Sequence, residues 1–237
     1  MDLEVCQLGL LPYGEALAVQ EKLLTLRQER QIGDLLLLLQ HPPVITLGKR
    51  GKQDHILASQ AFLQEHQVAV YSANRGGDVT YHGPGQLIGY MFIDLHNHGR
   101  DIRRFVENLE QVFITLLAKY YQIEAFRDPH PKYTGVWVNE GKITAIGLAV
   151  KRWVTMHGFA FNINTNLDHF RWIIPCGITD KGVTSLQALL GRELDLAAVA
   201  EQVIDCFCEI FNYHPKAITT AQLDAYLRSN SDAHAQA

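Results

Sequence analysis

The chain has 237 residues, of which 47% are hydrophobic and 19% are charged, and its formal net charge is −4 at pH 7. This composition is typical of a folded globular protein and excludes the intrinsically disordered class. Because the chain lacks the basic excess on which nonspecific nucleic-acid binding depends, DNA and RNA are poor candidates for its main partner.

The N-terminal stretch and the longest apolar run indicate a cytoplasmic protein without a membrane segment. MDLEVCQLGL is acidic before it is apolar and lacks the basic region of a secretory signal. The longest aliphatic run, LLLLL at 35–39, is far shorter than the ~20 residues that a membrane span needs. We expect a cytoplasmic location, a single domain over residues 1–228, and a frayed polar tail over residues 229–237.

The first predicted elements are a helix and two strands. From Tyr13 to about Glu29, apolar residues recur at intervals of three and four, which is the spacing of an amphipathic helix. The runs LLLLLQ at 35–40 and VITLG at 44–48 are then predicted strands. Pro42 and Pro43 lie between these runs and forbid a helix there.

A glycine-rich loop is predicted next. A short helix over 58–66 and a strand over 68–73 precede the sequence RGGDVTYHGPGQ at 75–86, and a strand over 86–95 follows it. The loop cannot be a Walker phosphate loop, because no lysine follows its glycines and it leads into a strand instead of a helix.

In the second half of the chain, predicted helices alternate with predicted hairpin strands. A long helix is predicted from Ile102 to Tyr120, and a final helix is predicted from the N-cap Asp195 to about Tyr213. Between them come two strands around the three-residue turn Asn139-Glu140-Gly141, a third strand over 154–164, and an irregular segment over 168–185. This order predicts an α+β (α/β) domain with a mixed, mostly antiparallel sheet flanked by helices, and not a doubly wound parallel sheet.

The glycine-rich loop has two interpretations. Its glycines allow a ligand to approach the backbone closely, while Arg75 and His82 supply a charge and a proton donor or acceptor. Alternatively, the loop is only a long connection whose arginine and histidine cap strands. The glycines concerned are Gly76, Gly77, Gly83 and Gly85.

Among the four cysteines, Cys176 is the candidate for a reactive thiol. The four cysteines show neither C-x-x-C nor zinc-ligand spacing, which indicates reduced thiols. Cys206 and Cys208 fall in an apolar helix and Cys6 in a strand, where a thiol packs as a small hydrophobe. Cys176 lies between a proline and a glycine in an irregular segment, where a sulfur atom can face a cleft.

A nucleophilic Cys176 needs a nearby cation or base, because an ordinary thiol is mostly protonated at neutral pH. The sequence offers three candidates, His82, His157 and Lys142. The alternative for Lys142 is an ordinary solvated lysine, since it follows a hairpin turn.

The strings RGGDVTYHGPGQ, KITAIG, HGFAFNIN and PCGI, in this order, resemble the lipoyl(octanoyl) transferase family, and the resemblance covers roughly residues 35–189. Members of that family move an octanoyl group from acyl carrier protein to a lysine of a lipoyl-accepting domain. They share their fold with the catalytic domains of lipoate and biotin protein ligases. The resemblance therefore implies this fold and an acyltransferase activity.

The resemblance also implies roles for particular residues. Cys176 would be the acyl-accepting nucleophile, and Lys142 would promote its ionisation. The residues implied in substrate binding are Arg75, Gly76, Gly77, Asp78, Val79, Thr80, Tyr81, His82, Ala145, Ile146, Gly147, Gly158, Phe159 and Ala160. No metal and no cofactor is implied.

The partners implied are octanoyl-acyl carrier protein as donor and, as acceptors, the lipoyl-accepting domains of 2-oxoacid dehydrogenase complexes and the glycine cleavage H protein. The residues 49–52 or Lys151-Arg152 could form a basic patch facing the acidic carrier, although both are ordinary as surface charge.

Three alternatives remain. An ATP-dependent lipoate or biotin ligase shares the fold but has no use for a cysteine nucleophile. A noncatalytic module that binds acyl-carrier protein would leave Cys176 incidental and Lys142 at the surface. A cysteine hydrolase would need an open site, and the sequence shows no separate Cys-His-Asn signature.

Overall fold

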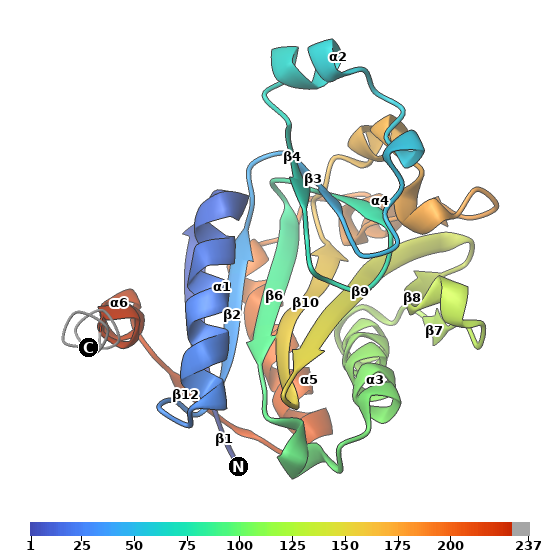
Figure 1. The fold of residues 1–237 in the computed structure, drawn as a ribbon. Coiled ribbons are helices and arrows are strands. Elements are labelled where there is room, and N and C mark those ends of the chain that lie inside the picture. Colours follow the sequence, from blue (N-terminus) through green and yellow to red (C-terminus); the bar gives the residue numbers. More distant parts are fainter. Residues whose placement is uncertain (229–237) are drawn as a thin grey trace.

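The computed structural model describes residues 1–228, and the expected polar tail at 229–237 lies outside them. A large mixed sheet forms the centre (Figure 1). Its main strands are, in spatial order, β12 (His214–Ala217), β1 (Asp2–Leu10), β2 (Asp34–Gln40), β6 (Gln86–Phe92), β10 (Val154–Asn162), β9 (Gly141–Lys151), β8 (Gly135–Val138) and β7 (Phe126–Arg127). The short strand β11 (Gly182–Val183) pairs with the start of β9.

The pairing confirms the predicted fold class. All neighbours from β2 to β7 are antiparallel, whereas β12, β1 and β2 run parallel to one another. The leucine run of β2 is buried on both faces, with Leu36 and Leu38 on one side and Leu35, Leu37 and Leu39 on the other. An unbroken apolar run therefore belongs here to a central strand.

Helices cover both faces of this sheet (Figure 1). The helices α1 (Tyr13–Gln28) and α6 (Thr220–Arg228) pack on one face, and α3 (Ile102–Tyr121) and α5 (Leu196–Phe211) pack on the other. A further short helix, α4 (Leu186–Leu190), precedes α5. In residues 1–228, none of the helices combines the length and the apolar character that crossing a bilayer requires.

A small sheet lies at one end of the large one, at the top of Figure 1. Its strands are, in spatial order, β4 (Ala69–Ser72), β3 (Val44–Leu47) and β5 (Val79–His82), and α2 (Gln60–Glu65) lies between β3 and β4 in the chain. The strand β5 corrects the sequence analysis, which placed residues 75–86 in one loop. VTYH pairs antiparallel with β3, because its β-branched and aromatic residues suit a strand and bury their side chains there.

The predicted helices α1, α3 and α5 and the hairpin β8–β9 are confirmed, with two corrections. The hairpin turn has two residues, Asn139 and Glu140, instead of three, and Asn139 has the left-handed conformation (φ 50°). The helix α5 begins after Asp195, whose side chain accepts the N–H of Ala197 as predicted, but it is not the last element. Neither β12 nor α6 was predicted from the sequence. Every residue of β12 is exposed, so that segment has no apolar pattern, whereas α6 carries one in Leu223, Tyr226 and Leu227, which pack in the same core as α1.

Candidate active site

Cys176 lies on a short 3-10 turn, Pro175–Gly177, which packs beside β5. Its backbone is left-handed, with φ 57° and ψ 17°, and Gly177 follows with φ 65°. A left-handed residue other than glycine costs roughly 1–2 kcal/mol, so the surrounding structure must hold this turn. Part of that support is the N–H of Ile174, which donates to the carbonyl oxygen of His55 at 2.7 Å. The turn leaves the Cys176 side chain partly exposed.

Lys142, near the start of β9, is buried with 6% of its surface exposed. Its Nζ lies 3.8 Å from the Sγ of Cys176 and donates to the carbonyl oxygen of Thr134 at 3.0 Å. The ring of Trp137 lies 4.9 Å from the same nitrogen, a cation–π contact. Lys142 is therefore not the solvated lysine of the alternative interpretation. An ammonium held out of water beside the thiol favours the thiolate.

Arg75 ties the loop before β5 to β3. Its Nη2 donates to the carbonyl oxygen and to the Oγ1 of Thr46, at 2.7 and 2.8 Å, and its Nη1 donates to the carbonyl oxygen of Gly76 at 3.0 Å. Burial lowers the pKa of Arg75, and the charge of a Cys176 thiolate acts in the opposite direction. Arg75 thus braces the loop and places a positive charge near the sulfur.

His82 and His157 are buried and uncharged at neutral pH. Burial is the main reason that the pKa of His82 falls to about 3 and the pKa of His157 to about 4. The Nδ1 of His82 lies 2.8 Å from the Oε1 of Gln86 and its Nε2 lies 3.4 Å from the Oγ1 of Thr46, so its hydrogen bonds connect β5 to β6 and to β3. The Nε2 of His157 has no hydrogen-bond partner among the described residues.

Glycines open a space between the loop and the large sheet. Gly147 of β9 pairs with Gly158 of β10, and the N–H of Gly76 donates to the carbonyl oxygen of Leu148 at 2.9 Å. A Cβ on Gly147 would lie 3.1 Å from the carbonyl oxygen of Gly76, and one on Gly158 would collide with the carbonyl oxygen of Gly89. Gly147 therefore allows the loop to approach the sheet closely, and Gly158 allows β10 to lie against Gly89 of β6.

Three cavities within the described residues reach Cys176, and the two larger ones bear on the chemistry of its thiol. The first, which we call the inner slot, has a volume of about 510 Å³ including its open mouth. It is lined by Tyr13, Arg75, Gly76, Gly77, Thr80, His82, Ile88, Tyr90, Ala145, Ile146, Gly147, His157, Gly158, Phe159, Ala160 and Cys176. The second, the outer cleft, has a corresponding volume of about 1160 Å³, and Cys176, Lys142 and Asp78 line it. The thiol lies where a narrow slot opens into a broad cleft.

The structure thus brings together most of the residues implied by the resemblance. Two side chains lie elsewhere, because β5 turns them away from the slot. Val79 is buried in the small core beneath the small sheet, and the hydroxyl of Tyr81 lies 2.6 Å from Nδ1 of His169. The ring of Phe159 packs against Phe113 of α3, with ring centroids 4.8 Å apart.

Several residues around the site were missed by the sequence analysis. Tyr13, Ile88 and Tyr90 line the inner slot, but in the sequence they belong to ordinary amphipathic or apolar patterns. His41, which directly precedes Pro42 in the sequence, lies with its Nε2 2.7 Å from the hydroxyl of Tyr90. No local signal distinguishes these positions, because folding alone brings them to the slot.

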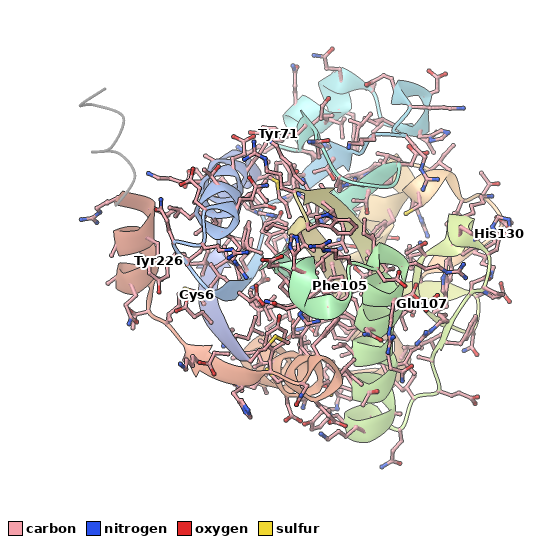
Figure 2. The ribbon with its side chains drawn as sticks, turned by 60° about the horizontal axis from the view of Figure 1, so that its bottom comes forward. Cys6, Tyr71, Phe105, Glu107, His130 and Tyr226 are labelled. Carbon is pink, nitrogen blue, oxygen red and sulfur yellow. The ribbon has the colours of Figure 1, made fainter. Side chains whose placement is uncertain are left out.

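The other cysteines are buried, as expected of structural thiols. Burial raises the pKa of Cys206 and of Cys208 to about 11, and it also raises the pKa of Cys6. Figure 2 shows Cys6 near Tyr226 of α6, on the opposite side of the molecule from His130, which directly precedes the Pro131 and Lys132 of the outer cleft. Over the described range 1–228, no group of three or more His, Cys, Asp or Glu side chains could hold a metal ion.

Residues 12–208 match the family model of the lipoyl protein ligase A/B catalytic domain. The chain is 52% identical over 224 residues to an octanoyltransferase of Desulforamulus reducens, covering 94% of this chain and 97% of that one. It is 56% identical over 211 residues to an octanoyltransferase of Caldicellulosiruptor bescii, covering 89% and 92%.

Solved structures support the fold. A bipartite lipoate protein ligase from Thermoplasma acidophilum, described together with its E2 lipoyl domain, superposes with a TM-score of 0.72 at 15% identity, covering 98% of this chain and 92% of that one. A biotin protein ligase from Aquifex aeolicus gives a TM-score of 0.51 at 12% identity, covering 89% and 69%. At these identities the likeness concerns the fold alone.

Proposed function

Because the chain belongs to the lipoyl protein ligase A/B catalytic domain family, and relatives at 52% and 56% identity are octanoyltransferases, we propose that it carries an octanoyl group as a thioester on Cys176. The enzyme is an acyltransferase of protein lipoylation. Its donor in this proposal is octanoyl-acyl carrier protein, and its acceptor is a lysine of a lipoyl-accepting domain. Residues 1–228 form the catalytic domain, and a cytoplasmic location is part of the proposal.

The observation that carries the proposal is the pair of Cys176 and Lys142 at the junction of the two cavities. The 3.8 Å between Nζ and Sγ places a positive charge where a thiolate forms. The inner slot offers an apolar chain a place beside the sulfur, since most of its lining is glycine, alanine and hydrophobic or aromatic residues. The outer cleft leaves the same sulfur open to large partners.

The first half-reaction exchanges one thioester for another. The Cys176 thiolate attacks the carbonyl carbon of the donor, a new C–S bond forms, and the C–S bond to the carrier's thiol breaks. The departing thiolate takes a proton, for which the Lys142 ammonium is the nearest donor. Since a thioester replaces a thioester, this step needs no activation by ATP.

The second half-reaction forms an amide. The acceptor lysine attacks the acyl group, the C–N bond forms, and the Cys176 sulfur leaves. An amide is more stable than a thioester, so this step runs downhill, again without ATP. The proposed lysine acceptors are the lipoyl-accepting domains of 2-oxoacid dehydrogenase complexes and the glycine cleavage H protein.

Each addition places negative charge on the acyl oxygen, and backbone donors at the slot can stabilise it. The N–H of Gly177 is committed to the carbonyl oxygen of Ile174 at 3.0 Å. The N–H groups of Gly77 and of Cys176 itself have no hydrogen-bond partner among residues 1–228. We assign the oxyanion to these two donors.

An assay without nucleotide tests the proposal. Octanoyl-acyl carrier protein and an unmodified lipoyl domain should give octanoylated domain when ATP is absent. Free octanoate with ATP should give neither product nor pyrophosphate. Pyrophosphate release with octanoate would favour the ATP-dependent ligase, and binding of the carrier without any transfer would favour the noncatalytic module.

A further inference from the structure

His55 and Asp78 form a hydrogen-bonded pair in the wall of the outer cleft. The Oδ2 of Asp78 lies 2.6 Å from the Nδ1 of His55. The Oδ1 of the same carboxylate accepts the backbone N–H groups of Val79 and Lys52, at 2.7 and 3.2 Å. A carboxylate fixed in this way holds the proton of the neutral imidazole on Nδ1 and leaves Nε2 as an acceptor.

The pair lies directly against the turn that carries the nucleophile. A Cβ on Gly177 would lie 2.7 Å from the Oδ2 of Asp78 and 3.1 Å from the Cε1 of His55, so the residue after Cys176 must be a glycine. The side chain of His55 is 21% exposed and lines the same cleft as Cys176 and Lys142. It can therefore meet a group that approaches the sulfur from outside.

The chemistry of the acceptor requires a base at this place. A lysine side chain with a pKa of about 10.4 is an ammonium at neutral pH and has no lone pair with which to attack. Lys142, which has given up its proton in the first half-reaction, can take only one of the two protons that this ammonium loses on becoming an amide. His82 and His157 line the inner slot and are absent from the outer cleft, from which a protein acceptor arrives.

We propose that His55, oriented by Asp78, accepts the proton of the incoming lysine, an inference that rests on the proposed function. One proton passes from the lysine ammonium to the Nε2 of His55. The amine attacks the acyl carbon, the C–N bond forms, the C–S bond to Cys176 breaks and leaves a thiolate, and the second amine proton passes to Lys142, which becomes an ammonium again. The His55 imidazolium then returns its proton to solvent.

Some charged groups around His55 stabilise its imidazolium form and others destabilise it. Asp78 stabilises the imidazolium through the hydrogen bond, and a Cys176 thiolate at the end of the reaction does so through space. The cations that line the same cleft destabilise the imidazolium, and they are Arg50, Lys52, Lys132 and Lys142.

The test uses the octanoyl-enzyme of the wild type and of His55→Gln, and follows transfer to a lipoyl domain in single turnovers across pH. The variant should be slowed about 100-fold at neutral pH, the usual scale of general base catalysis. Its rate should then rise about tenfold per pH unit toward the pKa of the acceptor lysine. Hydroxylamine, already uncharged at neutral pH, should release the octanoyl group at the wild-type rate. His66→Gln, on an exposed histidine outside the cleft, is the matched control.

The variant Asp78→Asn tests whether His55 acts as a base or only supports the structure. The amide oxygen can keep the two backbone N–H bonds of Oδ1, which turns the NH2 group toward the Nδ1 of His55 and forces the ring proton onto Nε2. This variant should therefore lose lysine transfer as His55→Gln does, with hydroxylamine release unchanged.

The inference is wrong if His55→Gln transfers the octanoyl group to the lipoyl domain at the wild-type rate, or if it slows release by lysine and by hydroxylamine equally. It is also wrong if His55→Gln cannot form the octanoyl-enzyme, because His55 is assigned to the second half-reaction alone. Failure of the wild type to form an octanoyl-enzyme would instead contradict the proposed function.

Discussion

At Cys176 the chain places a thiol on a left-handed turn next to a buried ammonium. The resemblance pointed to Cys176 and Lys142, which lie 34 positions apart in the sequence, but spacing alone gives no distance between them. The distance follows from the fold, since β9 carries Lys142 and the turn after Ile174 carries Cys176. The His55–Asp78 pair, 23 positions apart, could not be predicted, because it depends on where the segment before α2 meets β5.

Lys142→Ala should lower the fraction of thiolate at Cys176. Without the ammonium at 3.8 Å, alkylation of Cys176 by iodoacetamide at neutral pH should be about tenfold slower, because the thiolate loses the positive charge nearest to it. Lys119→Ala, on an exposed lysine of α3, is the control. An unchanged alkylation rate would remove Lys142 from this role.

Three buried histidines should make the fold sensitive to acid. Burial lowers the pKa of His41 and His157 to about 4 and the pKa of His82 to about 3, whereas an unfolded histidine titrates near 6.5. Between these values the unfolded state binds more protons, so the free energy of unfolding is fully present above about pH 6.5 and falls as the pH falls toward 4.

At pH 5, each of these histidines should have lost about 2 kcal/mol of its contribution to the free energy of unfolding. His157→Asn removes one of them and keeps a residue that tolerates the left-handed backbone, φ 60°. Urea unfolding at pH 8 and at pH 5 should show a smaller difference for this variant. A difference as large as that of the wild type would contradict the assignment.

At the scale of elements, β9 and β10 build the slot through their facing glycines. The sequence predicted both strands, but it could not tell that Gly147 and Gly158 face each other, because register comes from the pairing of the whole hairpin. The strand β5 was missed for a related reason. Four glycines around VTYH have the signature of a loop, and only the partner strand β3 makes this segment regular.

Gly147→Ala should narrow the inner slot. Its Cβ would lie 3.1 Å from the carbonyl oxygen of Gly76 and 3.3 Å from the Cδ of Arg75, so the neighbours must shift, at a cost of about 1–3 kcal/mol in stability. The ratio of kcat/KM for octanoyl over acetyl thioesters should fall, with Gly33→Ala, which meets no atom within 4 Å, as control. An unchanged ratio would show that the chain does not lie against Gly147.

At the scale of the whole molecule, the net charge is −4, yet cationic side chains are concentrated in one region. Arg50, Lys52 and Lys132 line the outer cleft together with Lys142, at the sulfur end of β9. The other patch considered from the sequence, Lys151-Arg152, lies at the opposite end of that strand, about 30 Å from Lys142 at ~3.3 Å per residue. The sequence alone could not distinguish these two basic patches, because it does not show which of them lies beside the site.

Charge reversal at the cleft should weaken binding of the acidic carrier protein. Arg50→Glu with Lys52→Glu should raise the KM for octanoyl-acyl carrier protein about tenfold, and added salt should reduce the difference. Lys151→Glu should leave this KM unchanged. Equal effects from both changes, or none from either, would show that the carrier does not approach over the outer cleft.

The proposed mechanism depends on one covalent intermediate. Intact-mass measurement of the wild type and of Cys176→Ala, each incubated with octanoyl-acyl carrier protein, tests it most directly. We predict that the wild type gains one octanoyl group, that hydroxylamine removes it, and that Cys176→Ala gains none. Acylation of Cys176→Ala to the same extent as the wild type would contradict the account.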